Sequence, residues 1–347
     1  PPPPFFFFQP YEGIRYPLWS RGLGDVYKRQ CVEIGMYPQI NKKSGWQGCN
    51  LTEINGGKCN TEEDFYKACR AASILGTLQA GYTDFKFLSN TSKKIFDREA
   101  LLGVSITGWM NNPNILFDEK ILQKGAKIVK DVNKEVAAVI GINPAARTTC
   151  VKPSGNASVL LQTASGIHAE HSSMYIRNVQ MNKESEITQA IMKTNPYMVE
   201  ESVWSAGGTD VVVSFPILPK KGSMYKDDLL GVKHLELVAK AQKYWVEVGT
   251  NEDLCADKGV RHNVSNTIIV DDWNAVENYV FENRHSFAGI SFFKSRITLG
   301  IKPASLKHSD PSSVFKLSSI FGKSTIHLIP KSQALETSFN NPFISHL

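Results

Sequence analysis

The chain has 347 residues, of which 42% are hydrophobic and 21% charged, and a formal net charge of +6 at pH 7. This composition is typical of a folded globular protein, and no apolar run of eighteen residues predicts a membrane span. The excess of Lys and Arg comes from the two ends of the chain, so it does not indicate a nucleic-acid partner, although mild positive charge suits anionic small substrates.

The cysteines indicate reduced thiols rather than a disulfide framework or a metal site. There is no CxxC pair and no Cys/His cluster with zinc spacing, so we expect no metal ligands and a cytoplasmic location. Most of the six thiols are expected to be small buried hydrophobes. They are at positions 31, 49, 59, 69, 150 and 255.

Both ends of the chain differ from the rest. Residues 1–30 begin with four Pro and four Phe, and residues 20–30 match the conceptual translation of a sequencing-library adapter, so we expect this stretch to be artefactual. Residues 294–347 keep no strand or helix period and are expected to be out of frame or disordered. Residues 31–293 remain as one large domain with a substantial core.

Helical and strand patterns alternate along residues 31–293. Residues 61–80 and 118–140 are predicted helices, since apolar side chains recur at helical spacing, Thr61–Asp64 is close to a capping box, and Gly81 and Gly141 follow. Further helices are predicted at 183–193, 231–248 and 274–283. Strands are predicted at 147–151, 175–181, 210–215, 263–270 and 287–293, and residues 101–109 are expected to form a buried strand or a tight turn. This alternation predicts an α/β fold built from βαβ units with parallel pairing.

A turn after the 147–151 strand is the clearest candidate binding element. Pro153 lacks a backbone donor, Gly155 allows close approach, and an apolar run that starts a helix follows. Unpaired amides and the helix dipole at such a turn can hold a phosphate. The alternative is an ordinary strand-to-helix turn with Ser and Asn caps.

Seven runs of residues then resemble one family. They are Cys31–Ile34, Cys49–Asn55, Lys152–Ser158, Ser165–His168, Tyr175–Val179, Arg261–Thr267 and Ser286–Gly289. They occur in the order found in ribonucleotide reductases, and the chain most resembles the monomeric, adenosylcobalamin-dependent class II ribonucleoside-triphosphate reductases. The resemblance extends from Cys31 to about Phe293.

The resemblance implies a fold and an activity. The fold would be part of a ten-stranded α/β barrel, mainly its second half-barrel with the finger loop. The activity would be reduction of ribonucleoside triphosphates to 2′-deoxyribonucleotides for DNA synthesis. The implied cofactor is adenosylcobalamin, and the implied partners are the nucleotide substrate and a thioredoxin-like dithiol protein. A monomer under allosteric control, with no nucleic-acid or membrane partner, is expected.

The same resemblance assigns site residues. Cys31 matches the finger-tip cysteine that becomes a thiyl radical when the cobalt–carbon bond of the cofactor breaks, and abstracts the 3′-hydrogen. Glu33 matches the carboxylate that takes the 3′-hydroxyl proton as general base. Cys49 matches one of two cysteines that deliver reducing equivalents and close to a disulfide. The substrate phosphates would be gripped by Pro153, Ser154, Gly155, Asn156, Ala157 and Ser158.

Other interpretations stay open. Without the family pattern, Cys31 would be a buried strand thiol and Cys49 an inert loop thiol. His168 and His262 are expected to orient loops through hydrogen bonds. The run Gly166–His168 favours the cobalamin class over the iron-dependent class I ribonucleoside-diphosphate reductase large subunit, which is the alternative enzyme. A nucleotide-binding fragment without catalysis is a second alternative. A kinase or ATPase is not expected, because the run Lys152–Ser158 lacks the Gly-Lys-Ser/Thr ending that holds phosphate and magnesium in those enzymes.

Three departures from the family pattern lead to a further expectation. Arg29 stands where the family has a substrate-binding asparagine, and the second redox cysteine and the effector site belong to an upstream half-barrel. The region that completes cofactor binding is also unmatched. We therefore expect the intact parent protein to be a reductase and the chain as written to be inactive.

Overall fold

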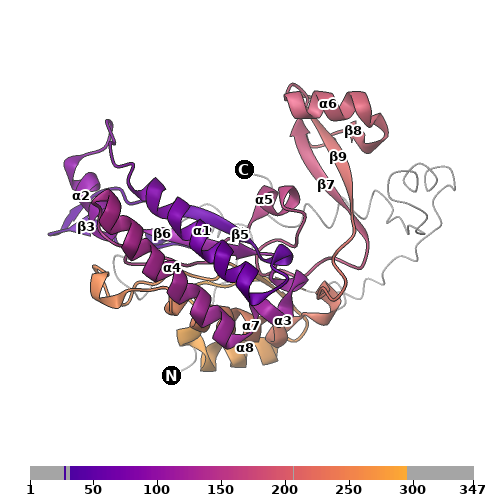
Figure 1. The fold of residues 1–347 in the computed structure, drawn as a ribbon. Helices are drawn as coiled ribbons and strands as arrows, with labels where there is room; N and C mark the ends of the chain where they lie inside the picture. Colours follow the sequence, from indigo (N-terminus) through magenta and orange to yellow (C-terminus); the bar gives the residue numbers. More distant parts are fainter. Residues whose placement is uncertain (1–26, 29–31, 206, 295–347) are drawn as a thin grey trace. The chain divides into compact units, whose positions relative to one another are not determined.

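The structure is a computed structural model that describes residues 27–28, 32–205 and 207–294 (Figure 1). The helices are α1 (Glu62–Ala80), α2 (Asn90–Glu99), α3 (Pro113–Leu116), α4 (Glu119–Ile140), α5 (Gly155–Leu160), α6 (Glu186–Thr194), α7 (Gly231–Ala241) and α8 (Trp273–Glu282). The strands are β1 (Tyr27–Lys28), β2 (Gly35–Met36), β3 (Gln39–Ile40), β4 (Lys43–Ser44), β5 (Asn50–Asn55), β6 (Leu102–Thr107), β7 (Tyr175–Asn182), β8 (Val199–Glu201), β9 (Asp210–Ile217), β10 (Thr267–Val270) and β11 (Ser291–Lys294).

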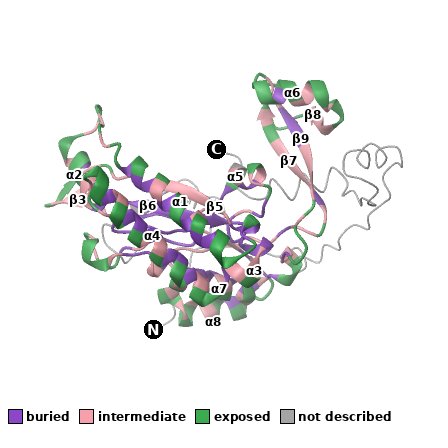
Figure 2. Ribbon diagram, in the orientation of Figure 1, coloured by how far each residue is buried: buried purple, intermediate pink, exposed green. Residues whose placement is uncertain are grey.

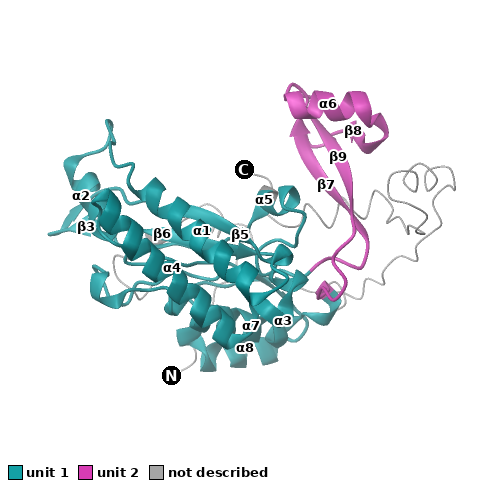
Figure 3. Cartoon of the chain, viewed as in Figure 1, with its two compact units in different colours: residues 1–169, 227–295 teal, residues 170–226, 296–347 magenta. Residues whose placement is uncertain are grey.

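These elements form two compact units, which Figure 3 colours separately. Among the described residues, unit 1 contains 27–28, 32–169 and 227–294, and unit 2 contains 170–205 and 207–226. The predicted domain boundaries at residues 30 and 293 stay predictions. Among the described residues no helix is long and apolar enough to cross a bilayer.

Parallel pairing organises unit 1. β5 pairs with β6 so that Leu51 lies opposite Gly103. Residues 147–151 continue the pairing beyond β6, because Leu102 N donates to Arg147 O and Cys150 N donates to Val104 O. Val151 then makes a parallel bridge to Val264. Four segments far apart in the sequence thus lie side by side and run in one direction, which confirms the predicted α/β class in this unit.

Two long helices cover this layer. α1 packs against β5, β6 and α4, and α1 and α4 run side by side in Figure 1. The side chains of Thr61 and Asp64 form a capping box at the start of α1. The Asp118 side chain caps α4 by accepting hydrogen bonds from two backbone N–H groups of its first turn. All six residues of β6 are buried, as expected for a parallel strand covered on both faces (Figure 2).

The strand at 147–151 has two different sides. Thr149 Oγ1 donates to Trp245 O, and Trp245 Nε1 donates back to Cys150 O, so one side faces the π-helical segment Gln242–Glu247 that continues α7. Because side chains alternate along a strand, Cys150 and Lys152 face the opposite side. That side is where the expected site residues gather.

Unit 2 corrects one expectation. We predicted parallel pairing of the strands on either side of the 183–193 helix, but β9 lies between β7 and β8 and is antiparallel to both. Lys183 N, just after β7, donates to Thr209 O, just before β9. The excursion through α6 and β8 therefore returns to the end of the sheet where it began, and a parallel partner would have to start at the other end.

Candidate active site

The segment that follows the predicted radical cysteine is anchored in unit 1. Cys31 itself lies outside the described residues, so its role stays a prediction. Glu33 is 2% exposed, and its carbonyl oxygen accepts a 2.9 Å hydrogen bond from Asn263 N. A Cβ added at Gly289 would lie 2.7 Å from Val32 Cγ1, so the chain packs closely there. We call Val32–Gly35 the finger segment.

Asn263 links the finger segment to the predicted phosphate turn. Asn263 O accepts from Val151 N at 3.2 Å, while Asn263 N donates to Glu33 O. Val151 is two residues before Pro153, the start of the turn. One residue of backbone therefore separates Glu33 from the strand that carries the turn, although more than a hundred positions separate them in the sequence.

The predicted turn and helix are present, but residues 147–151 before them form an extended segment with isolated β-bridges rather than the full strand that was predicted. Lys152 N donates to Ser105 Oγ at 2.9 Å, Ser154 has a φ of 66°, and α5 begins at Gly155. Ser158 Oγ donates to Gly155 O and contacts Ser165 Oγ at 2.7 Å. Ser154 is 5% exposed, and its Oγ has no hydrogen-bond partner among the described residues. The turn thus holds a hydroxyl that a ligand oxygen could satisfy.

Two thiols lie on the inner side of the parallel layer. Cys49 directly precedes β5, and its sulfur is 3.9 Å from His262 Nε2. Cys150 is fully buried, and a Cβ at Gly103 would lie 3.1 Å from both its sulfur and Ile34 Cδ1. Burial raises the pKa of Cys150 well above its usual value, and the charges of Cys49 and Glu33 add to the effect. The finger segment and both thiols therefore share one interior.

A charged pair crosses this inner side. Glu53 lies opposite Ser105 in the β5–β6 register, and Lys152 Nζ is 3.2 Å from Glu53 Oε2. The Glu53 side chain is 9% exposed, and its Oε1 atom has no partner among the described residues. Lys152 places positive charge beside the turn, in a region that also contains carboxylates.

His168 and His234 orient loops through hydrogen bonds, as expected for His168. His168 Nε2 accepts from Thr267 N at 3.0 Å, and its ring lies edge-on to His234, with centroids 5.9 Å apart. His234 Nε2 is 3.0 Å from Ile167 O. Burial lowers the pKa of His168, and burial together with the neighbouring His168 lowers the pKa of His234 to about 3. Both rings are therefore neutral at pH 7.

Several site residues were not predicted. Cys150 was expected to be an inert buried thiol, and Glu53, Lys152 and the contact of His262 with Cys49 had no assigned role. Period-two alternation could have placed Glu53 on the same face as Cys49. No such signal connects residues 49 and 262.

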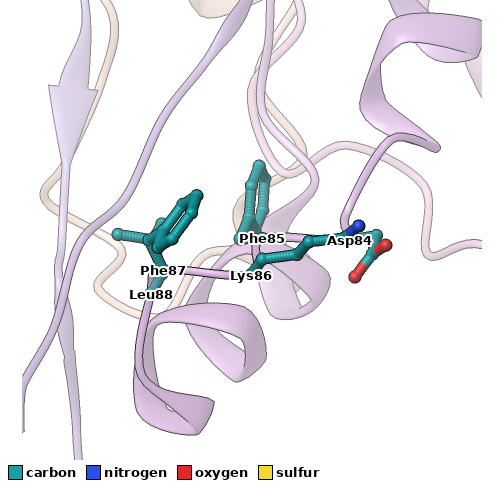
Figure 4. Close-up of a pocket in the computed structure, with 5 residues that line it drawn as sticks. All are labelled: Asp84, Phe85, Lys86, Phe87 and Leu88. Atoms are coloured by element: carbon teal, nitrogen blue, oxygen red, sulfur yellow. The ribbon is translucent and has the colours of Figure 1, made fainter.

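An open hollow elsewhere contains none of the predicted site residues. It is formed by five consecutive residues of the loop between α1 and α2, Asp84–Leu88, with the Phe85 and Phe87 rings projecting from the chain (Figure 4).

Among the described residues no group of three His, Cys, Asp or Glu side chains could hold a metal ion.

Comparison with known proteins identifies the relatives of this chain. It is 26% identical over 205 residues to a probable adenosylcobalamin-dependent ribonucleoside-triphosphate reductase of Dictyostelium discoideum. It is 24% identical over 206 residues to the adenosylcobalamin-dependent ribonucleoside-triphosphate reductase of Euglena gracilis. The chain is thus similar in sequence to adenosylcobalamin-dependent ribonucleoside-triphosphate reductases. The resemblance seen in the sequence is thereby confirmed.

The fold agrees with this relationship. The crystal structure of a B12-dependent class II ribonucleotide reductase matches 92% of this chain and 45% of that chain, with a TM-score of 0.62 and 16% identity. This likeness confirms the predicted partial barrel. No protein-family model matches the chain. The matched region covers 57% of this chain but only 26% and 27% of the two curated relatives, so the chain spans about a quarter of their length.

Proposed function

We propose that this chain forms part of the catalytic site of a reductase that converts ribonucleoside triphosphates to 2′-deoxyribonucleotides. The observation that carries the proposal is the hydrogen-bonded path from Glu33 through Asn263 to Val151. It places a buried carboxylate beside the strand that leads to an anion-binding type of turn. The curated relatives carry the same activity in their names.

Glu33 is the proposed general base. Loss of a ribose 2′-hydroxyl becomes easy once a radical at C3′ has formed and the 3′-hydroxyl proton has a base to accept it. Cys31 would abstract the 3′-hydrogen as a thiyl radical, and Glu33, two residues later, would take the 3′-hydroxyl proton. Glu33 is 2% exposed, so a proton held on its carboxylate is shielded from bulk water.

Cys49 is the proposed electron donor. Together with a second thiol it would supply two electrons and two protons to the substrate and close to a disulfide, which an external dithiol protein of the thioredoxin type would reopen. A soluble monomer acting on a free nucleotide is the simplest assembly consistent with this role.

The turn at Pro153–Ser158 is the proposed phosphate grip. Its amides, the buried Ser154 hydroxyl and the nearby Lys152 ammonium favour an anion. The experiment is equilibrium binding of a ribonucleoside triphosphate to the full chain and to its G155D variant. An Asp in the first turn of α5 suits the helix dipole, so the fold is kept while an anion is repelled.

We expect G155D to weaken nucleotide binding at least about tenfold, the loss of one charge-assisted contact. The control is G207D in a loop of unit 2, where a Cβ meets nothing closer than 3.6 Å, and it should bind like the unaltered chain. Equal affinity of G155D and G207D would remove the turn from the proposal.

Adenosylcobalamin is the cofactor named for both relatives, and it would supply the radical chemistry when bound. The interior that contains Glu33 and Cys49 is lined by thiols, carboxylates and a lysine, a set that suits a polar nucleotide rather than a large corrin ring. The proposal therefore limits the described residues to binding the nucleotide, holding the proton at Glu33 and supplying the Cys49 thiol, while Cys31 lies outside them.

A further inference from the structure

The His262 ring connects three segments that meet behind the proposed site. The side chain is fully buried. Its Nδ1 is 3.2 Å from Gly35 N in the finger segment, and its Nε2 is 2.8 Å from Leu102 O at the start of β6. The same Nε2 is 3.9 Å from the Cys49 sulfur.

These partners fix the tautomer. The Gly35 amide can only donate, so Nδ1 accepts and carries no proton. The Leu102 carbonyl can only accept, so Nε2 carries the proton. The ring is then neutral. Its one N–H donates to Leu102 O at 2.8 Å, and the Cys49 sulfur lies 3.9 Å from the same nitrogen, where it can share that N–H. Gln242 holds the ring's backbone in place, since its Nε2 donates to His262 O and its Oε1 accepts from Val264 N.

We propose that His262 is a positioning residue for Cys49. The Nε2–H group of His262 orients the Cys49 sulfur and stabilises the thiolate form of that sulfur. This deepens the proposed function, because a redox thiol exchanges with disulfides as the thiolate. The carboxylates and the lysine that act on the adjoining Cys150 sulfur share this interior: Glu33, Glu53 and Lys152. The two carboxylates oppose a further negative charge, while Lys152 and the His262 N–H favour it.

Alkylation of Cys49 by iodoacetamide tests the proposal on the full chain, with peptide mapping to resolve each cysteine, between pH 6 and 9. In this reaction the thiolate sulfur forms a bond to carbon, iodide leaves, and the thiol proton passes to the buffer. The variants are H262N and H262Q. The Asn oxygen can replace Nδ1 as acceptor for Gly35 but offers no donor to Cys49, whereas the Gln amide can replace the Nε2 donor.

We expect alkylation of Cys49 at pH 7 to be about threefold slower in H262N, with the midpoint of its pH–rate profile about one unit higher. These values follow if one hydrogen bond changes the thiolate population about tenfold and the more basic thiolate reacts about threefold faster. H262Q should stay within about twofold of the unaltered chain. Cys255, whose sulfur contacts Arg147 and Asn251, is the internal control and should not change.

Two results would overturn the proposal: an H262N profile equal to that of the unaltered chain, or an H262Q profile as slow as that of H262N. If H262N does not fold, the unaltered chain decides, because the midpoint for Cys49 should lie below that for Cys255, and an equal or higher midpoint contradicts the role. Alkylation needs neither nucleotide nor cofactor, so its outcome is independent of whether the reductase assignment holds.

Discussion

Replacing His234 should make the protein less sensitive to acid. The His234 ring is 3% exposed, and its pKa is about 3 in the folded state against 6.5 for an unperturbed histidine. Between these two pH values the unfolded chain binds a proton that the folded chain does not. The free energy of unfolding therefore falls as the pH is lowered below about 6.5.

The size of the effect follows from the shift. A pH of 5 lies 1.5 units below the pKa of 6.5 that the histidine has in the unfolded chain, whereas the folded ring stays neutral at this pH. Protonation of the unfolded chain therefore favours unfolding by about 2 kcal/mol at pH 5 relative to pH 7. H234Q keeps a donor for Ile167 O and removes the titration. The loss of unfolding free energy between pH 7 and 5 should therefore be about 2 kcal/mol smaller in H234Q.

Urea unfolding followed by tryptophan fluorescence at pH 7 and pH 5 measures this difference. His168 is also buried with a lowered pKa, so H234Q should keep part of the acid sensitivity. H285Q changes an exposed histidine and should lose as much stability as the unaltered chain. If H234Q and H285Q lose the same unfolding free energy within about 0.5 kcal/mol, the assignment of a buried neutral His234 is wrong.

Two further substitutions test the packing behind the site. R147M removes the Arg147 guanidinium, which is 2.9 Å from the fully buried Glu99 carboxylate, and leaves Arg98 at 3.0 Å as the remaining cation, so it should lower the free energy of unfolding by about 3 kcal/mol. K127M, in an exposed pair with Asp131, should change the free energy of unfolding by less than about 1 kcal/mol. Similar values for the two variants in urea unfolding would contradict the buried pair. G103A places a Cβ 2.4 Å from Leu51 Cδ2 and should lower the free energy of unfolding, measured by thermal unfolding, by about 1–3 kcal/mol. G207A is the control and should leave this free energy unchanged. An unchanged free energy for G103A would show that the parallel layer is packed differently.

The long helices could be predicted because their signals are local. The capping box at Thr61 and the apolar period place α1 within a residue of its observed bounds, and Asp118 and Gly141 do the same for α4. α2 was missed because it carries few apolar residues. Its C-terminal end is held by tertiary bonds instead, since Arg98 donates to the carbonyls of Tyr37 and Gln39.

Strand direction and side-chain partners could not be predicted in the same way. The antiparallel return of β9 depends on where the excursion after β7 ends, which no local pattern records. At the site, the family resemblance indicated Glu33, Cys49 and the turn, but not the groups that hold them. Asn263 contacts Glu33, and His262 contacts Cys49, only in the folded chain. More than two hundred positions separate the two residues of each pair in the sequence.

Protection of Cys49 by nucleotide tests the central claim most directly, because the claim is that this thiol and the turn at Pro153–Ser158 serve one nucleotide. Iodoacetamide alkylation of the full chain is measured with and without a ribonucleoside triphosphate at a concentration equal to its dissociation constant for the unaltered chain, where a tenfold weaker variant stays mostly unbound. We predict that the nucleotide slows alkylation of Cys49 but not of Cys255, and that G155D loses this protection. Nucleotide binding that leaves Cys49 equally reactive, or protection that persists in G155D at the same nucleotide concentration, would contradict the account.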